Sequence, residues 1–376
     1  MEYIDLKTQY SRYKEEIDAS IIECMTNANF ILGKDVEVFE RKLAEYVGVK
    51  HSIGCASGTD ALQLIYMAYN IGRGDAVFCP DMTFIASIEP ACLMGAVPVF
   101  CDIDSSTFNI SVDSLERQIC NVLNEGKLKP KAVVAVDFLG NPADYDGLSR
   151  IAKKYNLLLI EDAAQATGSS YKGDMCGSFG DISATSFFPS KPLGCYGDGG
   201  AVFTDDENIL NTLLSLRVHG KGKTKYDNIR IGLNSRLDTV QAAVLSVKLK
   251  YLSDEMEKRQ LVAQRYREAF NNHFLMQEIN CDNTSSYAQF VICTDNKKER
   301  DELKQYLSDK NIPSIVYYPN ALHNLPVFHD IETYGEKLDN AVRYGECNLG
   351  LPFSPFLSTE DQDKVINAVL SYGGNK

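Results

Sequence analysis

The chain carries at residues 157–165 the sequence Leu157-Leu158-Leu159-Ile160-Glu161-Asp162-Ala163-Ala164-Gln165, in which an apolar run ends in two acids. An apolar run without polar alternation predicts a strand that is buried on both faces, as in a parallel sheet. Asp162 is then expected at the carboxyl end of this strand, where open α/β sheets bind their ligands. Because small residues follow it, Asp162 could instead be the N-cap of a helix. The segment alone leaves both interpretations open.

Similar apolar segments recur upstream of this one and alternate with segments of helical character. This alternation predicts a mostly parallel central sheet flanked by helices, which is the α/β fold class. The predicted strands are residues 52–56, 76–79, 96–100, 132–136 and 157–160. The predicted helices are residues 12–47 with a break at 30–33, a helix that begins at residue 61, and residues 85–94 and 148–155.

The sequence changes character near residue 245. A long stretch rich in Lys and Glu, residues 240–267, has helical character. Beyond it, predicted strands at 287–292 and 312–318 flank a predicted helix at 299–307, as in a small α+β domain. We therefore expect a large domain over residues 1–245, N-terminal helices included, and a small C-terminal α+β domain over residues 246–376.

Composition excludes several classes of partner. The chain has 376 residues, of which 51 are acidic and 38 basic, for a formal charge of -13. Such a surface repels polyanions, which argues against nucleic acid and anionic membranes as partners.

The N-terminus lacks signal-peptide features and no stretch approaches the ~20 apolar residues of a membrane span, so a cytoplasmic protein is expected. Eleven cysteines without a Cys-x-x-Cys pair predict buried free thiols and no metal site.

A lysine stands in an unusually apolar setting downstream, in Thr185-Ser186-Phe187-Phe188-Pro189-Ser190-Lys191, and a glycine-rich segment, residues 194–200, follows it. To act as a nucleophile, Lys191 must lose a proton, which requires a lowered pKa. A pyridoxal phosphate enzyme requires an acid at the end of a strand and, downstream, a serine and a lysine spaced as Ser-x-x-x-x-Lys. Asp162, Ser186 and Lys191 match this pattern. Asp162 would protonate the ring, Ser186 would hold the phosphate and Lys191 would bond the aldehyde. The alternative for Lys191 is a solvated surface charge.

Three further segments could complete such a site. Residues 58–60, Gly58-Thr59-Asp60, open a helix directly after a strand, and helix N-termini bind phosphate. Phe84 follows another strand and could stack on an aromatic ring. Asn234 and Arg236 precede a helix and offer a phosphate donor and a fork for a carboxylate. The alternatives are an ordinary N-cap turn, core packing and a surface loop, respectively.

Taken together, these segments resemble the DegT/DnrJ/EryC1/StrS nucleotide-sugar aminotransferases, within fold-type I of the pyridoxal phosphate enzymes. The resemblance extends from Ile4-Asp5-Leu6 to Leu351-Pro352. The segment 185–200 is most similar to the branch that aminates UDP-2-acetamido-2-deoxy-3-oxo-glucuronate for bacterial surface polysaccharides such as O-antigen. The motifs that carry the resemblance are Ser57-Gly58-Thr59-Asp60-Ala61-Leu62, Glu161-Asp162-Ala163-Ala164-Gln165, Ser186 to Lys191, and Gly232-Leu233-Asn234-Ser235-Arg236-Leu237-Asp238.

The resemblance implies a role for each position. Lys191 and Asp162 would be catalytic and would also bind the cofactor. Asn234 would reach the phosphate in a neighbouring subunit, so a homodimer with the site at the subunit interface is implied. The other cofactor-binding residues would be Gly58, Thr59, Asp60, Phe84, Gln165 and Ser186, and the substrate-binding residues Arg236, Tyr317 and Tyr318.

The implied reaction moves the amino group of L-glutamate to a keto sugar linked to UDP or dTDP. One departure leaves the sugar open, because Tyr317-Tyr318-Pro319 stands where the branch usually has His-Tyr-Pro. Other 3-keto or 4-keto sugars remain alternatives, as do a sugar dehydratase, whose relatives carry histidine in place of Lys191, and a non-catalytic sensor of nucleotide sugars. His323 and Phe328 fit a further family pattern without an assigned role.

Overall fold

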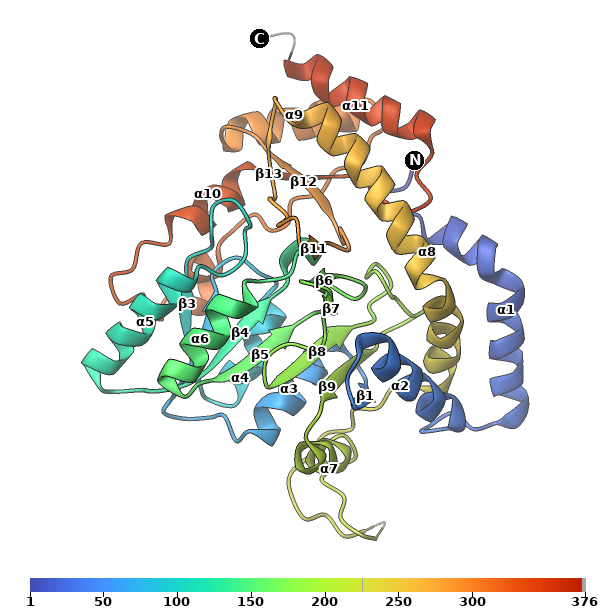
Figure 1. Cartoon of the computed structure of the whole chain (residues 1–376), viewed down its shortest axis with the longest axis vertical. Coiled ribbons are helices and arrows are strands. Elements are labelled where there is room, and N and C mark those ends of the chain that lie inside the picture. The colour runs from blue at the N-terminus through green and yellow to red at the C-terminus, as the bar shows by residue number, and fades with distance from the viewer. Residues whose placement is uncertain (225, 374–376) are drawn as a thin grey trace.

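The computed structural model describes residues 1–224 and 226–373, and its centre is a seven-stranded sheet (Figure 1). The strand order is β1-β9-β8-β5-β4-β2-β3. Neighbours from β8 to β3 are parallel, whereas β9 runs antiparallel to both β8 and β1. The mostly parallel sheet predicted from the apolar runs is therefore confirmed. The strands are β1 (His51–Cys55), β2 (Asp75–Pro80), β3 (Val97–Cys101), β4 (Lys129–Val136), β5 (Leu158–Asp162), β8 (Ile182–Ser186) and β9 (Gly200–Thr204).

Helices cover both faces of this sheet, because its strands are apolar on both sides. On one face α3 (Gly58–Ala68), α4 (Glu89–Leu93) and α7 (Glu207–Leu216) pack on the strands, and on the other α5 (Val112–Glu125) and α6 (Tyr145–Tyr155) do so. The predicted break at residues 30–33 separates two N-terminal helices, where Gly33 caps the second one. The remaining helical elements of this part are α1 (Leu6–Asn27), α2 (Lys34–Val47), η1 (Ile85–Ser87) and η2 (Phe138–Gly140).

The C-terminal part has its own core beside a three-stranded antiparallel sheet, β10-β12-β13. The long helix α8 (Thr239–Phe270) runs along it and contacts both α1 and α2 (Figure 1). The boundary expected at 245/246 falls inside this helix, so the division into two domains stays a prediction, and residues 374–376 lie outside the described residues. The further elements are β6 (Ser170–Tyr171), β7 (Asp174–Met175), β10 (Leu275–Met276), β11 (Asn283–Thr284), β12 (Phe290–Cys293), α9 (Lys297–Asp309), η3 (Leu322–Asn324), η4 (Pro326–Phe328), α10 (Asp339–Cys347), β13 (Asn348–Leu351) and α11 (Thr359–Gly373).

The strand predicted at residues 312–318 is wrong. In this segment only Ile315 pairs with another strand residue, in an isolated bridge to Gly350. Pro313 has no amide hydrogen to donate to a ladder, and the Tyr317 N–H donates instead to the side-chain oxygen of Asn348 at 2.7 Å. A side chain thus takes the place of a strand partner and leaves Tyr317 free of the sheet.

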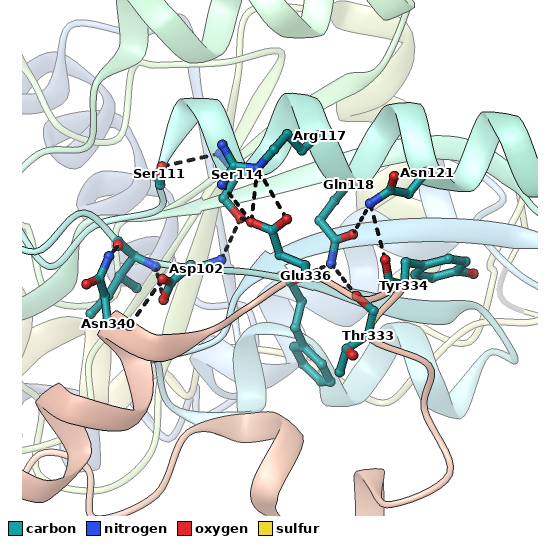
Figure 2. Close-up of polar contacts among 12 residues, drawn as sticks. Asp102, Ser111, Ser114, Arg117, Gln118, Asn121, Thr333, Tyr334, Glu336 and Asn340 are labelled. Atoms are coloured by element: carbon teal, nitrogen blue, oxygen red, sulfur yellow. Dashed lines mark hydrogen bonds and ion pairs between the residues drawn. The ribbon is translucent and has the colours of Figure 1, made fainter.

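A polar clamp attaches residues 333–341, which lead into and begin α10, to α5 and to Asp102 beyond β3 (Figure 2). The carboxylate of Glu336 accepts hydrogen bonds from Arg117 at 2.6 Å and from the Ser114 hydroxyl at 3.0 Å, both on α5. Asp102, just beyond β3, accepts from the N–H groups of Asn340 and Ala341. The clamp fixes the chain that follows the 317–328 segment. Further contacts of the clamp run from Gln118 to the Thr333 carbonyl and from Asn121 to the Tyr334 carbonyl.

All eleven cysteines are free thiols, as predicted, and most of them are buried, although Cys281 is exposed. Within residues 1–224 and 226–373, every helix is too short or too polar to cross a lipid bilayer.

Candidate active site

A cavity of about 370 Å³ lies at the carboxyl ends of β4, β5 and β8. It collects most of the site residues predicted from the sequence, although they come from distant segments of the chain. Asp60, Asn234 and Arg236 do not line it. The predicted residues on its wall are Gly58, Thr59, Phe84, Asp162, Gln165, Ser186, Lys191, Tyr317 and Tyr318, and the wall residues that sequence reasoning did not assign include Ser87, Phe188, Ser190, Asp198 and Gln289.

One end of the cavity is built to hold an anion. The side chain of Ser57 caps α3 by accepting the Asp60 N–H at 3.0 Å. The carboxylate of Asp60 turns back to the Ser57 hydroxyl at 3.2 Å, which explains why it is not on the wall. A Cβ on Gly58 would lie 2.6 Å from the Cβ of Ser186, so only glycine lets the helix approach that close. The helix N-terminus and the Ser186 hydroxyl therefore form one small polar cradle suited to a phosphate.

Asp162 ends β5 and is 5% exposed. One carboxylate oxygen accepts the Ser87 hydroxyl at 2.7 Å, and the other accepts the Ala164 N–H at 3.1 Å. Burial raises the pKa of Asp162, and these hydrogen bonds and the nearby charge of Lys191 oppose that shift. A turn rather than a helix follows it, so the N-cap alternative is wrong. Ser87 gave no signal in the sequence, because its contact with Asp162 spans 75 residues.

Lys191 lies in the loop between β8 and β9, where its backbone N–H donates to the Phe188 carbonyl at 2.8 Å. Burial lowers the pKa of Lys191 to about 8, against the opposing effect of Asp162. Its amine makes no hydrogen bond or ion pair with a residue that the structure describes. The buried Lys248 fixes the loop by donating to the Gly194 carbonyl at 2.7 Å. The solvated-charge alternative for Lys191 is therefore wrong, and a large share of its amines is neutral near pH 8.

Two neighbouring aromatic rings, those of Phe84 and Tyr318, line the cavity. Phe84 is 53% exposed and lies 5.8 Å from the ring of Tyr318, so it is not a core residue. Tyr318 hydrogen-bonds with Gln165, and burial raises the pKa of its phenol. The side-chain oxygen of Gln165 accepts the Leu139 N–H at 2.7 Å, which turns the amide nitrogen towards the cavity side.

Behind Asp162, on the opposite side of β5, lies a buried cluster of Asp137, Glu161 and Cys176. Their ligand atoms all lie within 4.8 Å of one another. Burial raises the pKa of Asp137 to about 6, and burial together with Asp137 raises the pKa of Glu161. Because two ionised carboxylates at this distance repel each other, we infer that the two acids share a proton at neutral pH.

Asp137→Asn is expected to change how stability depends on pH. A carboxyl group with a raised pKa stabilises the fold fully below its unfolded value near 4, and this contribution is lost as the pH rises through about 6. We therefore compare the free energies of unfolding of the wild type and the variant. The advantage of the wild type should fall by about 3 kcal/mol or less between pH 4 and pH 7. Urea unfolding across this range measures it, and a difference that does not vary with pH would contradict the shared proton.

Comparison with known proteins places the chain in a family. The model of the DegT/DnrJ/EryC1/StrS aminotransferase family matches residues 11–370. The UDP-2-acetamido-2-deoxy-3-oxo-D-glucuronate aminotransferase of Pseudomonas aeruginosa is 40% identical over 372 residues, 99% of each chain. A DegT DnrJ EryC1 StrS aminotransferase from Brucella abortus has a TM-score of 0.97 with 45% identity, covering 100% of both chains. The S. venezuelae protein DesV has a TM-score of 0.93 with 33% identity, covering 99% of this chain and 98% of that one.

Aminotransferases of this family depend on pyridoxal phosphate, and a solved relative that is 27% identical, NtdA of Bacillus subtilis, holds the amine form of this cofactor. The cavity fits it, since the Gly58 and Ser186 cradle, the buried carboxylate of Asp162 and the amine of Lys191 line the same cavity. This chain belongs to the DegT/DnrJ/EryC1/StrS aminotransferase family and is a pyridoxal phosphate-dependent nucleotide-sugar aminotransferase.

Proposed function

We propose that the enzyme moves the amino group of L-glutamate to C3 of UDP-2-acetamido-2-deoxy-3-oxo-glucuronate, as a step towards a bacterial surface polysaccharide. The observation that carries the transfer itself is the amine of Lys191, with a pKa lowered to about 8, in the same cavity as the buried Asp162. The choice of sugar is supported by 40% identity to the P. aeruginosa enzyme over 99% of both chains. Other 3-keto or 4-keto UDP- or dTDP-sugars are the alternative, since Tyr317 lies on the cavity wall where the branch usually has histidine.

Seven of the residues that line the cavity then have a task. The cofactor, when bound, supplies an electron sink for the bond broken at the amino donor's α-carbon. Lys191 moves the proton at that carbon, because its neutral amine is a base near physiological pH. Asp162 holds positive charge on the ring nitrogen, and Ser87 keeps the carboxylate oriented. Gly58, Thr59 and Ser186 would hold the phosphate, and Gln165 the ring hydroxyl.

Asn234 and Arg236 do not line the cavity of this chain. Asn234 is exposed and Arg236 is half-buried, on the segment that leads into α8. We propose that a second copy of the chain brings Asn234 to the phosphate, and that Arg236 meets a carboxylate of glutamate or of the uronic acid. The homodimer is therefore part of the proposal.

The substrate is tested by incubating the pure enzyme with ¹⁵N-labelled L-glutamate and a panel of 3-keto and 4-keto UDP- and dTDP-sugars. We expect the UDP-linked 3-oxo-uronate to gain the labelled amine faster than any other sugar, measured by mass spectrometry. Labelling of a 4-keto or a dTDP-linked sugar at a higher rate would reject the uronate and leave the aminotransferase reaction intact.

The same assay separates the two rival activities. A dehydratase would release the sugar's hydroxyl without taking up nitrogen, and Lys191 argues against it because such relatives carry histidine there. A sensor would bind nucleotide sugar without turnover. Adding L-glutamate alone should abolish the visible absorbance of the lysine-bound cofactor in a transaminase and leave it unchanged in a sensor.

A further inference from the structure

Hydrogen bonds between the buried Asp81 and the half-buried His323 join two chain segments that both contribute residues to the cavity lining. Asp81 is fully buried directly after β2, and Nδ1 of His323 lies 2.5 Å from its Oδ2. Its other carboxylate oxygen accepts the His323 N–H at 2.9 Å, and its backbone carbonyl accepts the Leu322 N–H at 2.7 Å. Three hydrogen bonds therefore connect Asp81 to His323 and Leu322 and fix these two segments relative to each other.

The segment after Asp81 forms one wall of the mouth. Thr83 and Phe84 line the cavity, and the Thr83 hydroxyl lies 3.0 Å from that of Ser87. Ser87 in turn donates to Asp162. The position of Asp81 therefore bears on both the exposed ring of Phe84 and the hydroxyl that orients the Asp162 carboxylate.

The segment before His323 also contributes to the cavity lining. Tyr317 and Tyr318 line the cavity, and η3 begins four residues after Tyr318. Apolar packing seats this segment on the sheet, because Leu322 and Phe328 join the main core and the ring of Phe328 lies 5.2 Å from that of Phe100. Apolar contacts have no fixed direction, whereas hydrogen bonds do. The position of residues 317–323 along the end of β2 therefore depends on the hydrogen bonds between Asp81 and His323.

We infer that His323 is a positioning residue of the transfer reaction: by its bonds to Asp81 it sets how the neighbouring rings of Phe84 and Tyr318 lie against each other, and with it the fit of the amino acceptor in the cavity. This inference rests on the proposed function for the identity of that acceptor. It gives a task to a histidine that touches neither the cavity wall nor the reacting atoms.

The test compares His323→Leu, which removes the donor, with His323→Asn, whose amide nitrogen can take the place of Nδ1. His329→Leu is the matched control, because His329 is an exposed histidine close to the same segment. With the keto sugar that the wild type aminates best, we expect KM to rise about tenfold in H323L, the scale of one lost charged hydrogen bond, while kcat changes less than about twofold. H323N should restore KM to within about threefold of the wild type, and H329L should match the wild type.

A second readout uses the protein without cofactor or substrate. In hydrogen–deuterium exchange, peptides covering residues 319–326 should exchange about tenfold faster in H323L and in Asp81→Asn than in the wild type, and at the wild-type rate in H329L. Unchanged exchange, or a loss of kcat with KM unaltered, would overturn the inference. If the wild type aminates no sugar in the panel, the proposed function fails. The inference is then tested by the exchange measurement alone, in which wild-type exchange of residues 319–326 in H323L would overturn it.

Discussion

Lys191→Ala should lower the rate of amino transfer by about 10³-fold or more, because in the proposed function Lys191 is both the attachment point of the cofactor and the base that moves the proton. The wild-type amine is suited to both tasks, since burial lowers its pKa to about 8. The variant should still bind the cofactor non-covalently through the cradle of Gly58 and Ser186. Single-turnover kinetics with L-glutamate and the visible absorbance of the purified protein measure the two effects.

The chain supplies its own control for this experiment. Lys248 is also buried, and burial lowers its pKa to about 8 as well. Its amine, however, donates to the Gly194 carbonyl and does not line the cavity. Lys248→Met should reduce stability by loosening the loop and leave the covalently bound cofactor in place. Wild-type turnover in Lys191→Ala, or loss of the covalent cofactor in Lys248→Met alone, would show that the wrong lysine has been assigned.

The parts of this site that could be predicted are those encoded in short, local patterns. The apolar run before Asp162 made it a strand end, and the apolar residues before Lys191 set that lysine apart from surface lysines. Neither of these two segments alone shows that Asp162 and Lys191 lie close together. That expectation comes from the general rules for parallel sheets, whose ligands bind at the carboxyl ends of the strands. Each of these predictions needed no more than about fifteen consecutive residues of sequence pattern.

What could not be predicted depends on contacts between distant residues. Ser87 acts on Asp162 across 75 positions, and Asp81 on His323 across 242. The strand expected at 312–318 was wrong because a side chain, Asn348, takes the amide that a ladder would need. The tasks given to Asn234 and Arg236 depend on a second copy of the chain or on a bound substrate, so they stay predictions.

Asp162→Asn should lower the rate of transfer by about 10²- to 10⁴-fold, comparable with the loss of an acid or base in other enzymes. A neutral amide cannot hold positive charge on the ring nitrogen, so the electron sink weakens although the cavity keeps its shape. Burial raises the pKa of the wild-type carboxyl group, and the hydrogen bonds from the Ser87 hydroxyl and the Ala164 N–H oppose that shift. Ser87→Ala should therefore show a smaller loss in the same direction. Steady-state kinetics of both variants, with cofactor content checked by absorbance, give the comparison.

Glu161→Gln is the matched control for this prediction, because it is the same kind of change one residue away. Successive side chains of a strand point to opposite faces, and Glu161 accepts the N–H groups of Gly177 and Phe179 behind the sheet instead of lining the cavity. It should alter stability and its pH dependence, since it ends the sharing of a proton with Asp137, and leave the turnover of the folded enzyme within about threefold of the wild type. Equal losses in the two variants would mean that Asp162 acts by holding β5 in place, and its assignment to the ring nitrogen would then be wrong.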